Sequence, residues 1–119
     1  MNKERLTLLA NHLRTVPPER LDMTVWTCGT VACAVGHACT IPELQEQGLS
    51  LSWISRSPDY AGERGWAAVT KFFDLSWGAS KLLFNSDSYV KPPTPTEVAD
   101  RIDYFVEHDG ALNIHGKLV

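Results

Sequence analysis

Three cysteines and a histidine make residues 28–39 the part of the sequence with the most chemistry to offer. The segment Cys28–Ala38 reads C-G-T-V-A-C-A-V-G-H-A, and Cys39 follows it. A thiol near a helix N-terminus has its thiolate stabilised by the helix dipole and by free N–H groups, which lowers its pKa. Cys28 or Cys33, with a downstream histidine as base, therefore defines one hypothesis, a thiol-dependent hydrolase or transferase.

The histidine in that hypothesis is His108 or His115, the latter within residues 113–116. Such a layout normally carries its histidine on a sheet of several strands, and the sequence predicts two strands at most. No second glycine-rich or amide-bearing loop for an oxyanion is evident. We therefore predict no catalytic residue and keep Cys28, Cys33 and His115 as the alternative.

A packing role explains the same two thiols more simply. If Gly29 caps a helix, Cys28 and Cys33 occupy the two positions of a hydrophobic staple and pack together at the helix entrance. If Thr30 caps the helix instead, the helix begins one residue later and the two cysteine side chains are still expected to lie close together. Buried free cysteine behaves as a small apolar residue, whereas a reactive one needs an accessible, electropositive setting. The staple is the favoured interpretation.

His37 adds a metal-binding hypothesis. Cys33 and His37 are spaced i, i+4, so both can reach one ion from a helix, with Cys28 or Cys39 as a third ligand. The full spacing, C-x4-C-x3-H-x-C, matches no zinc-finger or iron–sulfur pattern. We predict no metal and no cofactor, and we interpret His37 as a neutral core histidine held by a hydrogen bond.

The element that must position these residues is predicted to be a buried helix. Between Asp22 and Glu43 the sequence holds no formally charged residue, and a helix that is apolar or small all round is a buried one. We therefore expect a central helix over about residues 30–40. Its glycines and alanines let another helix or an indole ring approach closely. Four tryptophans are available for that contact: Trp26, Trp53, Trp66 and Trp77.

Other helices are indicated by caps and apolar stripes. Asn2 caps a first helix whose stripe includes Leu6, Leu9 and Leu13. A helix is expected over about residues 61–73, and Ser76 caps the next. The segment Thr94-Pro95-Thr96-Glu97 is a capping box with proline at the first helical position, and it begins the last helix.

Few strands are expected. Residues 49–54 alternate apolar and polar side chains, which is typical of a strand, and residues 57–59 read as a turn. The tail, residues 111–119, is the expected strand partner. The sequence thus predicts one domain over residues 1–119. Its fold class is mainly α, a compact bundle of five or six short helices around the buried helix at about 30–40, with a minor two-stranded β element.

Composition limits the partners. Hydrophobic residues make up 44% of the 119 and charged residues 21%, as in soluble globular proteins. A formal charge of −3 and the lack of a Lys/Arg cluster argue against nucleic acid. No apolar run spans a bilayer, and the N-terminus lacks a secretory signal. We therefore expect a cytoplasmic protein with reduced thiols and no membrane contact.

Three motifs resemble those of a group of small bacterial and phage-associated proteins of uncharacterised function. They are W-x-C-G-T-x-x-C-x-x-G-x-A at Trp26–Ala38, F-F-x-L-S at Phe72–Ser76, and T-P-x-E-V-A-x-R-I at Thr94–Ile102. The resemblance spans most of the chain and implies no activity. In that group tryptophan often stands at the position of His37, which implies a packing role there.

The sequence therefore favours a non-enzymatic binding or accessory protein that contacts a protein partner or a small ligand. It leaves self-association of the chain open. The candidate binding residues come from the cysteine segment and its flank: Trp26, Cys28, Gly29, Thr30, Cys33 and His37.

Overall fold

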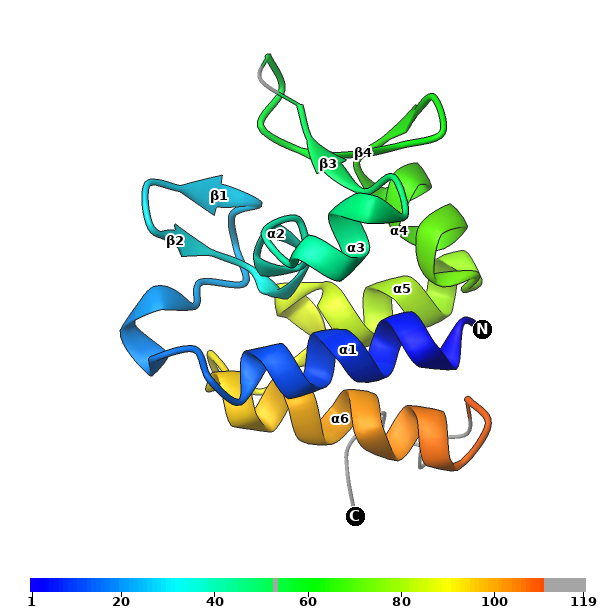
Figure 1. Ribbon diagram of the computed structural model, residues 1–119. Helices are drawn as coiled ribbons and strands as arrows, with labels where there is room; N and C mark the ends of the chain where they lie inside the picture. The colour runs from blue at the N-terminus through cyan, green and yellow to red at the C-terminus, as the bar shows by residue number, and fades with distance from the viewer. Residues whose placement is uncertain (53, 111–119) are drawn as a thin grey trace.

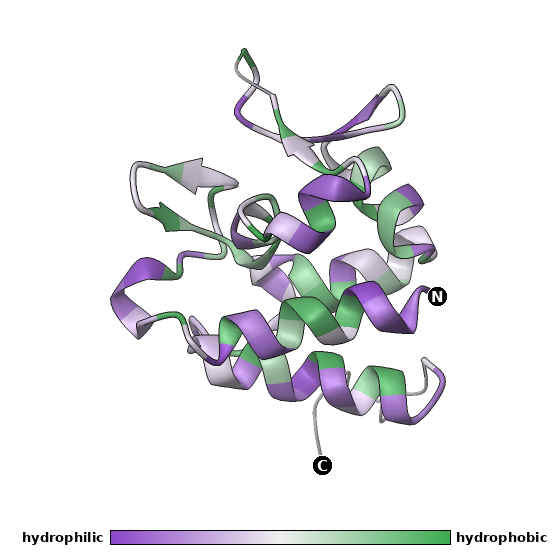
Figure 2. Cartoon of the chain, viewed as in Figure 1, coloured by the Kyte–Doolittle hydropathy of each residue, from purple (hydrophilic) through white to green (hydrophobic). Residues whose placement is uncertain are grey.

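Two long helices run antiparallel along one side of the molecule in the computed structural model, which describes residues 1–52 and 54–110 (Figure 1). They are α1 (Lys3–Leu13) and α6 (Pro95–Glu107). The predicted caps are confirmed, because Asn2 Oδ1 accepts from the Arg5 N–H at 3.0 Å and the capping box precedes α6. Both helices alternate hydrophilic and hydrophobic residues (Figure 2), and their apolar stripes are buried.

A second pair of helices, α4 (Trp66–Phe73) and α5 (Trp77–Phe84), packs against the first. Asp74 ends α4 in the left-handed region, and Ser76 caps α5 by accepting from the Ala79 N–H at 3.0 Å. A short 3-10 turn, η2 (Ser86–Ser88), follows. The core between the four helices is rich in phenylalanine, with three rings fully or almost fully buried: Phe72, Phe73 and Phe84.

The cysteine segment folds differently from the prediction. Its first half is a β-hairpin, β1 (Thr27–Cys28) and β2 (Val31–Ala32), and only its second half is helical, α2 (Ala34–Ala38). Gly29 at φ +65° takes the first turn position, which a two-residue II′ hairpin turn reserves for glycine. The predicted helix over 30–40 is thus wrong at its start, because this turn and the β-branched residues after it favour a hairpin.

A second small sheet was also predicted incorrectly. It has three antiparallel strands in the order β3 (Ser50–Leu51), β4 (Pro58–Tyr60) and β5 (Glu63–Arg64). The expected turn at 57–59 therefore overlaps a strand, and β3 pairs with that strand. The predicted partner tail, 111–119, lies outside the described residues. Two further short elements are η1 (Pro18–Arg20), which contacts β2, and α3 (Pro42–Glu46), which precedes β3.

The fold class is accordingly mixed α/β, which corrects the prediction of a mainly α bundle with one two-stranded element. The described residues form six α-helices and two antiparallel sheets, with 51% of these residues helical and 11% in strands. Short strands escaped prediction because two residues are too few to show an alternating pattern. In the described part of the chain, no helix has the length and apolar character needed to cross a membrane.

Candidate functional site

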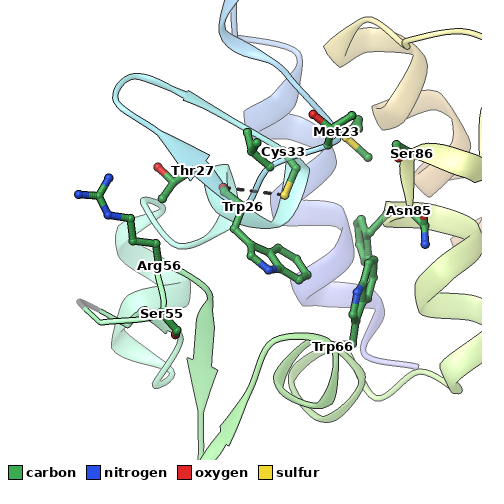
Figure 3. Close-up of a pocket in the computed structure, with 12 residues that line it drawn as sticks. Met23, Trp26, Thr27, Cys33, Ser55, Arg56, Trp66, Asn85 and Ser86 are labelled. Atoms are coloured by element: carbon green, nitrogen blue, oxygen red, sulfur yellow. Dashed lines mark hydrogen bonds between the residues drawn. The ribbon is translucent and has the colours of Figure 1, made fainter.

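A cavity of about 480 Å³ opens where the β1–β2 hairpin, the start of α4 and the end of α5 meet (Figure 3). We call it the tryptophan pocket, because Trp26 and Trp66 line it. Their ring centroids lie 5.1 Å apart at an interplanar angle of 60°, an edge-to-face arrangement. Phe84 extends the aromatic wall, and Asn85 and Ser86 supply polar groups beside it.

Trp26 is positioned by the close approach of α2. A Cβ atom added to Gly36 would lie 1.8 Å from the Trp26 carbonyl oxygen and 2.7 Å from Ala32 Cβ. No side chain other than hydrogen fits there. The sequence-based interpretation of Gly36 as a packing residue therefore gains a specific partner, the backbone of Trp26.

Trp66 is held from the other side by a cation. Lys81 Nζ, on α5, lies 4.3 Å from the Trp66 ring centroid and 5.4 Å from that of Trp77. Such cation–π contacts contribute on the order of 0.5–1 kcal/mol at exposed positions. Trp77 itself is 56% exposed and is not part of the pocket lining.

Arg56 stands at the mouth of the pocket on a strained turn. Its φ of +52° is unusual for a residue other than glycine. The turn is held by the Arg56 N–H bond to Ser52 O at 2.9 Å and by the 2.7 Å contact between the Ser55 and Ser57 hydroxyls. The guanidinium extends beside Thr27 and away from the indole rings (Figure 3). It is exposed and has no ion-pair partner among the described residues.

Cys33 is the N-cap of α2 and not a staple residue. Its Sγ accepts from the Gly36 N–H at 3.4 Å, and its S–H points to Trp26 O at 3.9 Å. Burial raises the pKa of the Cys33 thiol to about 11. Cys28 is exposed on the hairpin, so the predicted packing of Cys28 against Cys33 is wrong. The hairpin turn separates the two side chains.

Neither buried thiol has the electrostatics of a nucleophile. Burial raises the pKa of Cys39 to about 12, with a further contribution from Cys33, and its S–H donates to Ser50 O at 3.5 Å. Among the candidate bases, His108 lies at the C-terminal end of α6. Its ring stacks on that of Tyr104, with the two ring centroids 3.9 Å apart. His115 lies outside the described residues.

His37 is buried and hydrogen-bonded, as predicted for a core histidine. Its Nε2 lies 2.8 Å from Arg20 O, so that nitrogen carries a proton and donates. The His12 ring centroid is 6.4 Å from that of His37. Within residues 1–52 and 54–110, no three His, Cys, Asp or Glu side chains gather at one metal position.

The structure thus divides the predicted binding residues. Trp26 and Cys33 line the tryptophan pocket, Cys28 and Thr30 are exposed on the hairpin, and His37 is buried against η1. Several lining residues could not be predicted from the sequence, because they come from loops far apart in the chain. These are Arg56, Asn85 and Ser86.

Comparison with known proteins adds no relative. No protein-family model, no curated protein and no solved structure matches this chain significantly.

Proposed function

We propose that this protein is a non-enzymatic binding protein whose tryptophan pocket receives an aromatic or other planar group that carries negative charge. The observation that carries the proposal is the lining of the pocket. It offers two indole rings and Phe84 as an apolar wall, hydroxyl and amide groups beside them, and Arg56 as a cationic residue at the mouth. None of the described residues that line the pocket carries a carboxylate, so a bound anion is not repelled by a negative charge from them.

A binding role suits the chemistry of the buried thiols better than catalysis does. Cys33, the thiol in the pocket, has a raised pKa, and both its hydrogen-bonding capacities are used within the fold. A thiol nucleophile needs a lowered pKa. We further propose a cytoplasmic location, where free thiols persist.

Indole resonances in the NMR spectrum test the pocket directly. Phenyl phosphate is expected to shift the Nε1–H signals of Trp26 and Trp66, and benzyl alcohol, which is uncharged, is expected to bind more weakly. Replacing Arg56 by Gln should weaken phenyl phosphate binding by roughly fivefold, the equivalent of about 1 kcal/mol. Arg64→Gln is the matched control, because Arg64 is an exposed arginine on β5 away from the pocket lining.

A second pair of variants distinguishes binding in the tryptophan pocket from nonspecific binding to exposed aromatic side chains. Trp66→Leu should abolish the shift at Trp26, whereas Trp77→Leu removes an exposed tryptophan that also contacts Lys81 and should leave binding unchanged. Unperturbed indole signals at millimolar phenyl phosphate, or equal losses in the two variants, count against the proposal.

The thiol-enzyme alternative is tested by alkylation. With iodoacetamide at pH 8 the folded protein is expected to react quickly at exposed Cys28 and slowly at Cys33 and Cys39, until urea unfolds it. Mass mapping after tryptic digestion identifies the modified residue. Rapid modification of Cys33 with a midpoint below that of a free thiol would revive the enzymatic hypothesis.

A further inference from the structure

A second cavity, of about 380 Å³, adjoins the tryptophan pocket and shares Thr27 and Arg56 with it. Its remaining lining among the described residues consists of Gly29, Leu51 and Ser52. We call it the edge groove, because β1 and β3, which belong to different sheets, contribute its walls. In Figure 1 the two strands lie near each other without being paired.

The β1 wall presents a strand edge that pairs with no other described strand. Ala32 lies opposite Thr27, but the Ala32 carbonyl accepts from the Asp22 N–H at 3.0 Å on the other side of β2. The Thr27–Ala32 pair is therefore the non-hydrogen-bonded kind, and the bonds of the hairpin fall on the Cys28–Val31 pair next to the turn. It follows that the N–H and C=O of Thr27 point away from β2.

The β3 wall has the same character. Leu51 lies opposite Pro58, which has no N–H and whose carbonyl accepts from the Gly65 N–H at 2.9 Å, on the side of β5. The next residue, Ser52, donates instead to Ser57 O at 2.8 Å. Because successive backbone groups alternate in direction along a strand, the N–H and C=O of Leu51 point away from β4. No other hydrogen bond joins them to a described residue.

Natural sheets usually protect such edges with charge, and this protein does so at one edge only. The outer edge of the second sheet is β5, which consists of the exposed pair Glu63 and Arg64. The edges of β1 and β3 carry no charged residue. The only charge in the described lining of the edge groove is the Arg56 guanidinium, which has no ion-pair partner among the described residues.

We propose that the edge groove binds an extended peptide segment of a partner protein, which adds a strand at the edges of β1 and β3 and places an acidic side chain at Arg56. The unpaired donors and acceptors of Thr27 and Leu51 call for a polypeptide backbone, and the isolated cation calls for a carboxylate. The inference rests on the proposed function in one respect: the shared residues let an aromatic side chain of the same peptide enter the tryptophan pocket.

The test uses random dodecapeptides displayed on phage and selected against the wild-type protein, with Arg56→Gln as the counter-selection target. The selected peptides are expected to share an acidic residue, and the synthetic form of one should lose about tenfold in affinity for Arg56→Gln. Arg64→Gln, on the charged β5 edge, should bind it as the wild type does. Sedimentation velocity of the free protein checks whether a second copy already occupies the groove.

N-methylation of the synthetic peptide, one residue at a time, tests strand addition without altering the protein. Methylation of inward-facing amides should weaken binding at least tenfold, and methylation of the residues between them should have little effect, which gives an alternating pattern. A uniform pattern, failure to enrich any peptide over Arg56→Gln, or a dimer that dissociates in Arg56→Gln would overturn the inference.

Failure of this inference is distinguishable from failure of the proposed function. If phenyl phosphate shifts the Trp26 and Trp66 indole signals but no peptide is enriched, the proposed function of the tryptophan pocket is supported and peptide binding at the edge groove is overturned. If a peptide binds with the alternating N-methylation pattern and neither indole signal moves, strand addition is supported and the proposed function of the tryptophan pocket is overturned.

Discussion

The side formed by α1 and α6 and the side formed by residues 21–60 are built on different principles. We call them the helical side and the hairpin side. On the helical side, helices of 11 and 13 residues satisfy their own backbone groups and bury apolar stripes. On the hairpin side, no described helix exceeds five residues and the strands have two or three. Its order depends on single contacts between distant residues, such as Gly36 against the Trp26 carbonyl.

The difference explains where the candidate site lies. A helix uses its backbone donors and acceptors internally, so it offers a partner only side chains. Short strands and turns leave backbone groups unpaired and hold residues such as Arg56 in unusual conformations. The hairpin side therefore has the means to bind, and it has little redundancy if a contact is lost. The helical side has many equivalent contacts and tolerates more change.

The largest expected effect is that of Gly36→Ala on the hairpin side. The added methyl would lie 1.8 Å from the Trp26 carbonyl oxygen, which is backbone and cannot rotate away. Overpacking commonly lowers the free energy of unfolding by 1–3 kcal/mol, and here we expect about 3 kcal/mol or more. Urea denaturation followed by circular dichroism measures it.

Gly78→Ala is the matched control. Gly78 lies in α5 with nothing within 4 Å of an added Cβ, so alanine should stabilise the protein by about 0.5–1 kcal/mol through its helix propensity. Similar values for the two variants would mean that α2 is not fixed against Trp26, and the contrast between the two sides would fail.

Arg101 tests a place where the helical side also relies on a single residue. It is 6% exposed, its Nη1 donates to Leu82 O and Ser88 O at 3.0 and 2.9 Å, and its guanidinium stacks on Tyr89 at 3.8 Å. Arg101→Met removes the side-chain donor to Ser88 O and one of two donors to Leu82 O, which also accepts from the Ser88 hydroxyl at 2.8 Å. We expect a loss of roughly 2–4 kcal/mol in the free energy of unfolding.

The control for Arg101 is Arg14, also an arginine of the helical side. Arg14 pairs with Asp100 and Asp103 at 2.9 and 2.6 Å, but its side chain is 37% exposed. Solvent screens such a pair, so Arg14→Met should lower stability by less than about 1 kcal/mol, and by less still in 1 M salt. A larger loss at Arg14 than at Arg101 would contradict the role of burial.

The two sides also differ in how far the sequence could predict them. Asn2, Ser76 and the Thr94 capping box act within one helical turn, so local spacing sufficed to place the starts of three helices. The hairpin side depends on partners far apart in the chain. Its uncharged composition correctly indicated burial of α2 but could not distinguish a helix from a hairpin followed by a helix, because both can be apolar.

The candidate site was predictable only in part for the same reason. Trp26 and Cys33 stood out by type and spacing, and both line the tryptophan pocket. Arg56 and Asn85 reach it through the turn after β3 and the end of α5, which only the tertiary fold brings together. The glycine at position 29 was the available signal for the hairpin, since glycine favours the left-handed conformation that a II′ turn requires.

Thr94→Ala should produce a smaller loss on the helical side. The Thr94 hydroxyl accepts from the Glu97 N–H at 3.2 Å, and the Glu97 carboxylate accepts from the Thr94 N–H at 2.9 Å. Removing the hydroxyl should lower the free energy of unfolding by about 1 kcal/mol. Thr96→Ala, an exposed position in the same first turn, is the control and should change stability by less than half of that. A null result for Thr94 would show that α6 is held by packing alone.

The smallest expected effect is a pH dependence at His12, where α1 meets α2. Burial lowers the pKa of His12, the neighbouring His37 lowers it further, and Glu43 opposes the change. The unfolded chain therefore binds more protons than the folded one as the pH falls below the ordinary histidine value of about 6.5. This stabilising contribution is fully present above that pH and is lost as the pH falls toward the folded pKa, and the partial exposure of His12 keeps the loss small.

NMR titration of the His12 imidazole measures this coupling between the two sides. We expect a midpoint below about 6.5 in the wild type, because the folded state favours neutral His12. His37→Gln removes the imidazole that lowers the pKa of His12 and should raise the midpoint, whereas Glu43→Gln removes the carboxylate that raises it and should lower the midpoint. Midpoint shifts of opposite sign in the two variants would show that His12 on α1 is electrostatically coupled to both α2 and α3. Equal midpoints in all three proteins would show that the helical side does not sense the charges of the hairpin side.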